Sequence, residues 1–341
     1  MVKADAYGLG MVTVARALAE LGPWAFGVAT VAEGEALRAA GWQGRLLVFA
    51  PVPPGELERA AAAALTPGIS DEGTLRRWAA IAAERGERLP FHLEVDTGMG
   101  RAGFPWQKVV QWRGALQEAG NLLRWEGCFT HFHSADEPDL GATDQQWERF
   151  RQVVGELPPT SPPPVLHVAN SAGAMRRGGY GCDLARPGIF LYGGAVGAEV
   201  VPKPVVSVRA RVTLVRDVPA GATVGYGATH TAQAPERWGT LGIGYGDGIP
   251  RALARGGGEV LIRGRRVPII GRISMDMTTV DLTGLDIAAG EVATLIGDDG
   301  SETITLEEVA GRCGTISYEI LTGLRPRLPR VYLEEPLDGA D

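Results

Sequence analysis

A lysine at position 3 stands in a setting that suits covalent chemistry. It follows an apolar residue and precedes a turn rich in alanine and glycine, in the segment VKADAYGLG (2–10). Glycines that open a helix leave backbone N–H groups free, and such groups favour a phosphate. An amine beside a phosphate site is the arrangement that pyridoxal phosphate requires. A lone lysine is more often a solvated surface charge, so this interpretation needs support from the rest of the chain.

Two further patterns are typical of ligand sites. The segment GMGRAG (98–103) matches the G-x-G-x-x-G pattern of dinucleotide sites. It follows about the fourth predicted strand rather than the first, and Asp96 and Arg101 add charge to it, so we favour a glycine-rich loop at the carboxyl end of a strand. His131 and His133 share one face of a strand near Asp136, which leaves zinc as an alternative, although we expect no metal site.

The first 195 residues alternate short apolar runs with longer helical patterns. Strands are expected at 44–50, 91–95, 125–132, 165–169 and 188–192, and helices at 12–21, 71–85, 106–118 and 143–157. Asp71 and Thr143 are the expected N-caps of two of these helices. This alternation predicts an α/β fold with a parallel sheet and crossover helices. The length suits a (β/α)8 barrel of the TIM type, and a doubly wound sheet is the alternative.

The character of the chain changes near residue 204. Strand patterns then follow each other closely, at 207–218, 239–243, 259–262, 267–282 and 291–296, and only 305–313 resembles a helix of any length. We therefore expect a barrel domain over 1–204 and a mostly antiparallel β domain over 205–341.

Composition limits the class of protein. The 341 residues include 33 Lys and Arg against 40 Asp and Glu, and the resulting net charge of −7 argues against nucleic acid or a membrane surface as a partner. No apolar run reaches the roughly 20 residues of a membrane span. The three cysteines are far apart and odd in number, which fits a reducing cytoplasm better than a disulfide framework.

The segment VKADAYGLG resembles the cofactor-lysine signature of the alanine racemases. The resemblance continues in that family's order through HLEVDTGMGRAG (92–103), THFHSAD (130–136), HVANSAG (167–173), ARPGIFLYG (185–193), VGYGAT (224–229), GIGYGDG (242–248), GRISMDM (271–277) and TISY (315–318). These blocks cover nearly the whole chain, and together they are highly specific. The family's fold, a (β/α)8 barrel followed by a β domain, agrees with the organisation expected above.

The resemblance implies a two-base mechanism. Lys3 would hold pyridoxal 5'-phosphate as an aldimine and act on the D-face of the substrate, and Tyr226 would act on the L-face. Inversion at Cα needs proton removal on one face and delivery on the other, so two flanking groups make physical sense. Arg186, buttressed by His167, would face the pyridine nitrogen, which would stay neutral because an arginine gives up no proton.

The resemblance also implies how the ligands are held. The cofactor phosphate would be bound without a lysine or arginine. Its ligands would be the hydroxyls of Tyr7, Ser171 and Tyr318 and the backbone amides of Gly188 and Ile189. His131 would line the cofactor pocket. Arg101 and the amide of Met275 would bind the substrate carboxylate, and Tyr245 with Tyr318 would narrow the entrance and select small side chains.

The sequence departs from the family pattern at two places. Many members carry a carbamate-modified lysine at the position of Glu94, and that anion orients the arginine that corresponds to Arg101. Glu94 is already a carboxylate, so we expect it to anchor Arg101 directly. The family also has about 35 further residues upstream, which include most of a barrel strand, so we expect this chain to be short at its N-terminus.

The implied function is interconversion of L-alanine and D-alanine in the cytoplasm, which supplies D-alanine for peptidoglycan. Tyr226 and Met275 would reach the cofactor of the other subunit, so a homodimer with shared active sites is expected. A broader amino-acid racemase and a non-catalytic carrier of pyridoxal phosphate are the alternatives. Tyr245 and Tyr318 argue against the first, and the complete β domain argues against the second.

Overall fold

The computed structural model describes residues 1–159, 164–176, 180, 182–197 and 200–333. The chain divides into two compact units, one made of Met1–Tyr7 and Met11–Lys203 and the other of Gly8–Gly10 and Pro204–Asp341. In these described ranges, no helix is both long enough and apolar enough to cross a membrane.

The first unit contains a parallel sheet. Its strands follow the order β1 (Phe26–Val28), β2 (Leu46–Val48), β3 (Thr66–Ile69), β4 (Leu89–Asp96), β6 (Leu123–Phe129) and β7 (Val165–His167), and β5 (Phe104–Pro105) pairs with β4. Strands β1, β2 and β3 are buried along their whole length, as expected for a parallel sheet that is covered on both faces.

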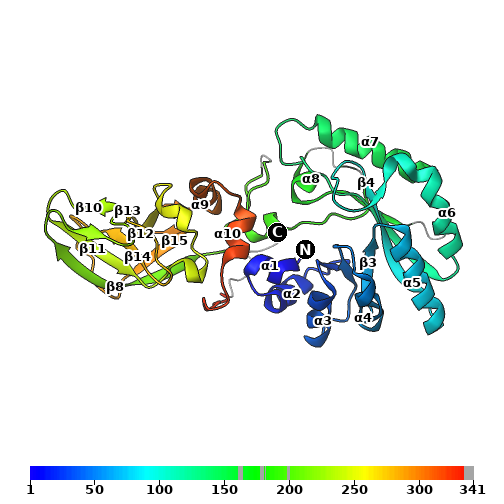
Figure 1. The fold of residues 1–341 in the computed structure, drawn as a ribbon, viewed down its shortest axis with the longest axis horizontal. Helices are drawn as coiled ribbons and strands as arrows, with labels where there is room; N and C mark the ends of the chain where they lie inside the picture. The colour runs from blue at the N-terminus through cyan, green and yellow to red at the C-terminus, as the bar shows by residue number, and fades with distance from the viewer. Residues whose placement is uncertain (160–163, 177–179, 181, 198–199, 334–341) are drawn as a thin grey trace, which may run out of the picture. The chain divides into compact units, whose positions relative to one another are not determined.

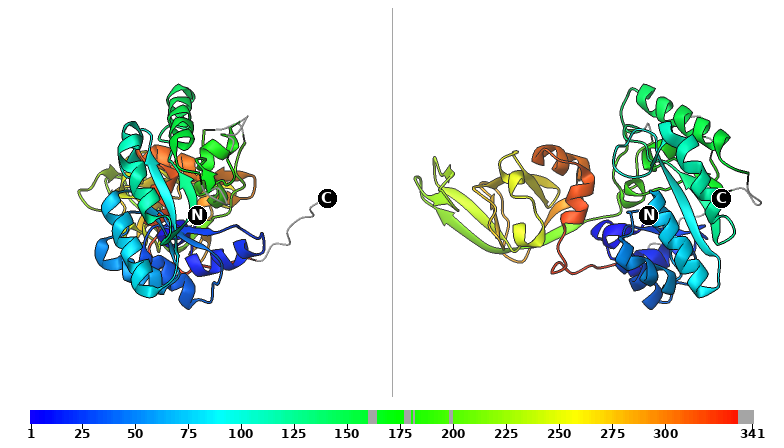
Figure 2. Two further views of the ribbon diagram at one scale, coloured as in Figure 1. Left: turned by 90° about the vertical axis from the view of Figure 1, so that its right-hand side faces the viewer. Right: turned by 45° about the vertical axis from the view of Figure 1, so that its right-hand side comes forward.

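Helices lie before, between and after these strands in the chain. They are α1 (Lys3–Gly8), α2 (Met11–Ala19), α3 (Val31–Ala39), α4 (Leu57–Ala62), α5 (Glu72–Arg85), α6 (Val109–Ala119), α7 (Gly141–Glu156) and α8 (Ser171–Met175), with short 3-10 turns η1 (Pro54–Glu56), η2 (Trp106–Lys108) and η3 (Ile189–Tyr192). Helices α3 to α7 flank the outer side of the strands (Figures 1 and 2). This TIM-like order of parallel strands and helices confirms the predicted fold class of the first unit.

Helix boundaries test the sequence interpretation more finely. Asp71 caps α5 as predicted, because its carboxylate accepts a hydrogen bond from the Thr74 amide at 2.9 Å. Thr143 does not cap α7. That helix begins at Gly141 with Leu140 as its N-cap, and Thr143 is buried in the first turn.

The segment 188–192 was expected to be a strand, and that expectation is wrong. Its residues form the 3-10 turn η3, which ends at Gly193 with φ of 84°. The Gly188 amide donates to Ser171 Oγ at 2.7 Å instead of joining a strand ladder. A side-chain acceptor at the start of α8 therefore overrides the strand propensity of this apolar run.

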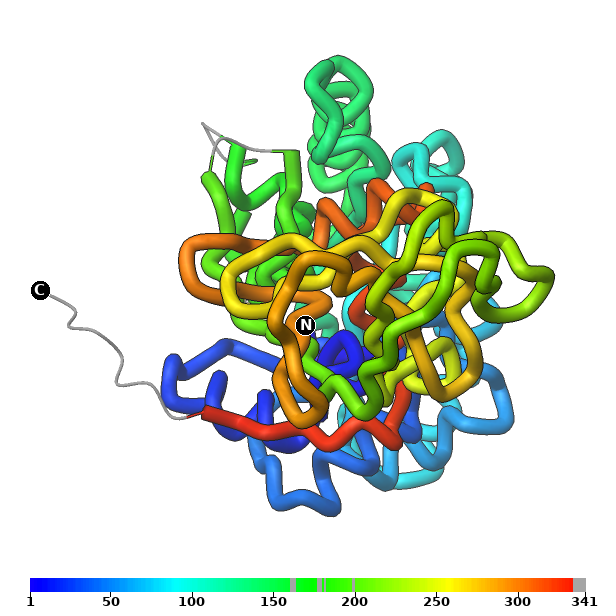
Figure 3. The backbone as a smooth tube through the Cα atoms, turned by 90° about the vertical axis from the view of Figure 1, so that its left-hand side faces the viewer, coloured from blue at the N-terminus to red at the C-terminus, as the bar shows by residue number. Residues whose placement is uncertain are grey.

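The second unit is an antiparallel sheet, as predicted. Its strands follow the order β12 (Glu259–Ile262), β13 (Arg265–Ile270), β14 (Thr278–Asp281), β11 (Glu236–Leu241), β8 (Val208–Val218), β15 (Val292–Asp299) and β16 (Glu302–Ile304). An additional pairing of β12 with β15 closes the sheet on itself. A hairpin of β9 (Thr223–Val224) and β10 (His230–Thr231) and the turns η4 (Tyr245–Asp247) and η5 (Arg251–Ala254) complete it. Figure 3 shows the path of the backbone as a tube coloured by residue number.

Two expectations for this unit need correction. The single run predicted at 267–282 is two strands, β13 and β14, because Gly271 at φ 69° turns the chain out of the sheet. Two helices follow the strands rather than one: α9 (Leu306–Cys313), which Thr305 caps, and α10 (Ser317–Gly323), which the sequence pattern did not indicate.

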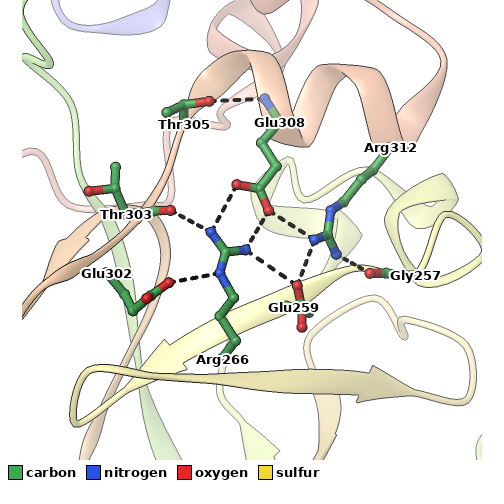
Figure 4. Close-up of polar contacts among 8 residues, drawn as sticks. All are labelled: Gly257, Glu259, Arg266, Glu302, Thr303, Thr305, Glu308 and Arg312. Atoms are coloured by element: carbon green, nitrogen blue, oxygen red, sulfur yellow. Dashed lines mark hydrogen bonds and ion pairs between the residues drawn. The ribbon is translucent and has the colours of Figure 1, made fainter.

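A network of ion pairs and hydrogen bonds joins α9 to the sheet (Figure 4). Arg266 on β13 pairs with Glu308 on α9 at 2.6 Å and with Glu302 on β16 at 2.9 Å. Arg312 on α9 pairs with Glu259 on β12 at 2.6 Å. The Arg266 guanidinium lowers the pKa of the Glu308 carboxyl. Because Ser317 at the start of α10 donates to Glu307 on α9 at 2.9 Å, the network also fixes the helix that carries Tyr318.

Candidate cofactor and substrate site

Lys3 is presented by a turn of left-handed backbone. Residues 4–7 have φ between 52° and 56°, and none of them is a glycine. Each L-residue in this conformation costs roughly 1–2 kcal/mol, because Cβ crowds the following carbonyl oxygen. The turn is held by its surroundings: the Val2 amide donates to Gly27 O on β1 at 2.8 Å, and the Ala6 amide donates to Val2 O at 2.9 Å. Strain that is held in this way is typical of functional sites.

The environment of Lys3 favours the neutral amine. Burial lowers the pKa of Lys3, the positive charges of Arg101 and Arg186 lower it further, and the carboxylate of Glu33 opposes them. The sequence contains three lysines, and the other two, Lys108 and Lys203, are exposed. Lys3 is therefore the lysine whose surroundings suit a nucleophile or a base.

Arg186 lies buried behind this turn in a fixed position. It donates to the carbonyl oxygens of His167, Thr130 and Val168 at 2.6, 2.9 and 3.1 Å, and it lies 5.8 and 5.5 Å from the ring centroids of Phe49 and Phe129. Burial lowers the pKa of Arg186 to about 10, so the guanidinium stays charged near neutral pH. The structure thus joins the ends of β6 and β7 through one cation.

Hydrogen bonding from Arg186 sets the protonation of three histidines. An arginine can only donate, so His167 Nδ1 at 3.1 Å and His131 Nδ1 at 3.4 Å must accept. His167 therefore carries its proton on Nε2 and donates it to His92 Nδ1 at 2.7 Å. His92 Nε2 is then a buried donor that has no partner among the described residues. His131 and His167 both lie within hydrogen-bond distance of Arg186.

His92 is a residue that sequence reasoning missed. A signal for it exists, because His92 and Glu94 are two positions apart on β4 and so face the same side of the sheet. Both side chains are buried. Gln146 of α7 is also buried, and its side-chain amide donates to His131 O at 3.0 Å and accepts from the His133 amide at 3.0 Å. His133 is thus held through its backbone.

These neutral histidines predict loss of stability in acid. Burial, with the charge of Arg186, lowers the pKa of His92 and His131 to about 3 and that of His167 well below its ordinary value. The unfolded chain binds a proton on each near pH 6.5. The free energy of unfolding should therefore fall as the pH drops below about 6.5, by up to about 4 kcal/mol per pH unit for three histidines.

Urea unfolding followed by tryptophan fluorescence between pH 7 and pH 5 measures this effect. Carboxylates that become protonated act in the same direction, so the His131→Asn variant is the control, and its slope should be smaller by about 1.4 kcal/mol per pH unit. An equal slope for the variant and the parent would contradict the neutral assignment of His131.

Four residues of the predicted phosphate site meet in the first unit. Tyr7 is buried and stacks on Tyr192 with 4.7 Å between ring centroids. A Cβ at Gly188 would clash with Tyr7 Oη, so a side chain there would force the buried Tyr7 ring to shift. Ser171 Oγ accepts from the amides of Gly188 and Phe190, which leaves its own proton to donate. Ile189 follows as the first residue of η3.

This set of donors fits a phosphate group. Hydroxyls and the amide end of a short helical turn provide neutral hydrogen-bond donors, which bind anions by their dipoles. The fit rests on the close contact at Gly188, where a side chain would fill the space beside Tyr7. The Gly188 amide itself is already bonded to Ser171 Oγ, so its predicted role passes in part to the Ser171 hydroxyl.

Glu94 is buried at the end of β4, and it accepts a hydrogen bond from Ser70 Oγ at 2.6 Å. Burial raises the pKa of its carboxyl, and the Ser70 hydroxyl and the charge of Arg101 oppose that shift. Arg101 is exposed and acts on Glu94 through space, since no ion pair joins the two among the residues that the structure describes. The expected direct anchoring of Arg101 by Glu94 therefore has no ion pair behind it, and a direct contact between the two stays a prediction.

The remaining predicted residues belong to the second unit. Tyr226 lies between Gly225 and Gly227, both at positive φ, in the turn from β9 to β10, and it is 67% exposed. Buried Val224, Ala232, Trp238 and Ile270 support this hairpin. Met275 is 53% exposed, and its carbonyl accepts from the Gly246 amide at 2.7 Å. This bond places Tyr245, at the start of η4, beside it, and Tyr318 is the second residue of α10.

Comparison with known proteins decides the family. Residues 1–196 match the family model for the alanine racemase N-terminal domain, and residues 205–332 match the model for its C-terminal domain. The chain belongs to the alanine racemase family.

Individual alanine racemases match over nearly the whole chain. The enzyme of Carboxydothermus hydrogenoformans is 41% identical over 345 residues, which cover 98% of this chain and 92% of that protein. That of Halothermothrix orenii is 37% identical over 338 residues, covering 97% and 89%. The crystal structure of the alanine racemase from D-cycloserine-producing Streptomyces lavendulae matches with a TM-score of 0.90 at 34% identity, covering 98% and 90%.

The cofactor prediction is confirmed with the family. A crystal structure of alanine racemase from Bartonella henselae with covalently bound pyridoxal phosphate matches with a TM-score of 0.89 at 31% identity, covering 97% of this chain and 91% of that one. The protein is thus a racemase of the pyridoxal-phosphate-dependent alanine racemase type. In the first unit, the partly buried amine of Lys3 and the hydroxyl of Ser171 have the chemistry that this cofactor requires.

Proposed function

We propose that this alanine racemase interconverts L-alanine and D-alanine with two bases, Lys3 on one face of the substrate Cα and Tyr226 on the other. The observation that carries the proposal is the strained turn that presents a partly buried Lys3 of lowered pKa. Pyridoxal phosphate, when bound, supplies an electron-withdrawing ring that stabilises negative charge at Cα. The side chains of this enzyme then have to bind, orient and exchange one proton.

Lys3 holds the cofactor covalently in this proposal and moves a proton at the D-face. A lowered pKa increases the fraction of neutral amine, which is the form that attacks a carbonyl or accepts a proton. Arg186, fixed by its three carbonyl contacts, would hold its positive charge toward the pyridine nitrogen of the bound cofactor. It cannot accept or give up a proton there, which favours return of the proton to Cα over side reactions.

Recognition of alanine is assigned to residues from both units. Arg101 and the amide of Met275 bind the carboxylate, and Tyr245 and Tyr318 restrict the size of the side chain. Glu94 orients Arg101 by its charge, in place of a modified lysine. The buried position of Glu94 and its electrostatic coupling to Arg101 support this assignment.

Glu94→Gln should raise the KM for alanine more than it lowers kcat. Loss of the anion leaves Arg101 less well oriented, so we expect KM to increase about tenfold and kcat to fall less than about threefold. Steady-state kinetics with L-alanine and with D-alanine as the substrate measures the separate effects on KM and kcat. Glu126→Gln, which removes a strand carboxylate on β6 that pairs with Arg124, is the matched control. An unchanged KM in Glu94→Gln would refute the anchor.

The proposed enzyme is a homodimer in which each active site uses residues of both subunits. Tyr226 and Met275 are more than half exposed, although their assigned tasks lie at the cofactor. In a dimer, the second copy of the chain would cover Tyr226 and Met275 of the first copy. These two residues would then lie at Lys3 of the second copy. A symmetric dimer then contains two equivalent sites.

Mixed dimers test both the assignment of the two bases and the sharing of each active site between two subunits. Lys3→Ala and Tyr226→Phe chains with different affinity tags are coexpressed, and the doubly tagged species is purified. If the bases come from different subunits, one of the two sites is intact, and the mixed dimer should show about half of the wild-type activity. If both bases come from one subunit, both sites lack a base and the mixed dimer should be nearly inactive. The control is a Lys3→Ala dimer that carries both tags, which should be inactive in either case.

We also propose that the product serves peptidoglycan synthesis in the cytoplasm. The acidic composition and the scattered cysteines are consistent with that location. Expression of the chain should allow a D-alanine-requiring bacterium to grow without added D-alanine, and failure of an active enzyme to do so would contradict this role.

A further inference from the structure

The two carboxylate oxygens of Glu33 have separate partners. Oε2 accepts from the amides of Ala29 at 2.7 Å and Thr30 at 3.3 Å, while Thr30 Oγ1 accepts from the Glu33 amide at 3.2 Å. This reciprocal arrangement is the capping box of α3. A capping box uses one oxygen of the glutamate. The second, Oε1, accepts from the Ala4 amide at 2.7 Å, 29 positions earlier in the chain.

The Ala4 N–H belongs to the backbone immediately after Lys3. It belongs to the peptide group that links Lys3 to Ala4, so its direction is set by the ψ angle of Lys3. It is also among the first N–H groups of the left-handed turn, which have no carbonyl of their own turn to bond to. Asp5, on the other side of this amide, is already used, since its Oδ1 accepts from the Met11 amide at the start of α2.

Glu33 also acts on Lys3 by charge. It is the carboxylate that opposes the effect of Arg101 and Arg186 on Lys3. The α-amino group of Met1 and the ring of His131 are the other titratable groups coupled to Lys3. Glu33 therefore acts on Lys3 in two ways. It accepts a hydrogen bond from the backbone amide that follows Lys3, and its negative charge stabilises the protonated amine of Lys3.

We propose that Glu33 is a positioning residue for Lys3, because its carboxylate holds the left-handed turn next to that lysine in place. The proposal rests on the proposed role of Lys3 as the cofactor lysine. It assigns to Glu33 a task beyond the cap of α3, because the Ala4 contact contributes nothing to that helix.

The test measures Lys3 itself in cofactor-free protein. Full-length chain is acylated over a range of pH, and the extent of labelling at each lysine is read by mass spectrometry, with exposed Lys108 and Lys203 as internal references. In Glu33→Gln, the midpoint of Lys3 labelling should move to lower pH by about half a unit or more, while the two references stay unchanged. Affinity for pyridoxal phosphate, followed by visible absorbance, should fall about tenfold.

Two variants separate positioning from other effects. Thr30→Ala breaks the other half of the capping box and leaves the Glu33 carboxylate in place, so it should lower the melting temperature without moving the Lys3 midpoint. Glu35→Gln removes a charge from the same helix, where Glu35 pairs with Arg59, and it should leave Lys3 unchanged. Glu33→Asp keeps the charge on a shorter side chain and should weaken cofactor binding with a smaller shift of the midpoint.

Two results would overturn the inference. One is a Lys3 midpoint in Glu33→Gln that coincides with that of wild type. The other is an equal shift in Thr30→Ala, which would reduce Glu33 to a helix cap. Failure of the wild-type chain to bind the cofactor at Lys3 would instead reject the proposed function, and the labelling of cofactor-free protein would still decide the role of Glu33.

Discussion

Replacement of Lys3 by alanine should abolish racemisation and the visible absorbance that develops when pyridoxal phosphate is added. The change removes both the covalent attachment of the cofactor and the base on the D-face, so a loss of at least about 1,000-fold in kcat is expected. Lys3 is partly buried on a rigid turn, whereas Lys108 and Lys203 are exposed, and no other lysine exists to take its place.

The measurement combines absorbance with mapping. Borohydride reduction of the wild-type holoenzyme should fix the cofactor to the peptide that contains Lys3, and mass spectrometry identifies it without ambiguity among three lysines. Lys108→Ala and Lys203→Ala are the controls and should retain full activity. Label on Lys108 or Lys203 in wild type, or an unchanged spectrum in Lys3→Ala, would reject the assignment of Lys3.

Tyr226→Phe should separate the two faces of the reaction. The variant lacks the hydroxyl that would move the proton of L-alanine, while Lys3 is intact for the proton of D-alanine. We therefore expect conversion of L-alanine to fall by about 1,000-fold, and exchange of the Cα proton of D-alanine with solvent deuterium to fall by less than about tenfold.

Proton NMR in D2O follows both quantities in one experiment, starting from either isomer. Tyr245→Phe is the matched control, since it removes a tyrosine hydroxyl from another turn of the same unit and should affect both isomers equally. Equal losses of exchange for L-alanine and D-alanine in Tyr226→Phe would argue against bases on separate faces.

Much of the fold could be predicted from local patterns. Helices with one apolar face and a strong N-cap, such as α5 after Asp71 and α9 after Thr305, begin within a residue or so of the expected positions. Strand β12 at 259–262 matches the prediction at both ends. In these segments periodicity, capping and burial favour the same structure, and no distant contact overrides them.

The missed elements depend on contacts between distant residues. Strands β1 and β3 have three and four residues, too few to show a period, and their strand conformation depends on neighbouring strands on the sheet. Segment 188–192 has strand-like residues but bonds to Ser171 Oγ, which no local pattern indicates. Thr143 resembles a cap, yet α7 begins two residues earlier and buries it.

The site shows the same division. Motifs indicated Lys3, Arg186, His131, His167 and Ser171 as candidate site residues, because these residue types occur in specific blocks. The links between them could not be read in this way, since the histidine pair His92–His167 and the Glu33–Ala4 contact join residues 75 and 29 positions apart. Only the folded chain shows which histidine nitrogen accepts and which backbone amide a carboxylate holds.

The left-handed turn after Lys3 has a consequence for the handedness of the residues themselves. Ala4 and Ala6 have φ of 52° and 53°, a conformation that an L-residue adopts only at a cost. A D-residue has the mirror-image preference, so D-alanine at either position would occupy its own favoured region of backbone conformation. Next to Lys3, the proposed cofactor lysine, the enzyme thus contains two alanines whose backbone conformation suits a D-residue better than the L-residue that translation inserts.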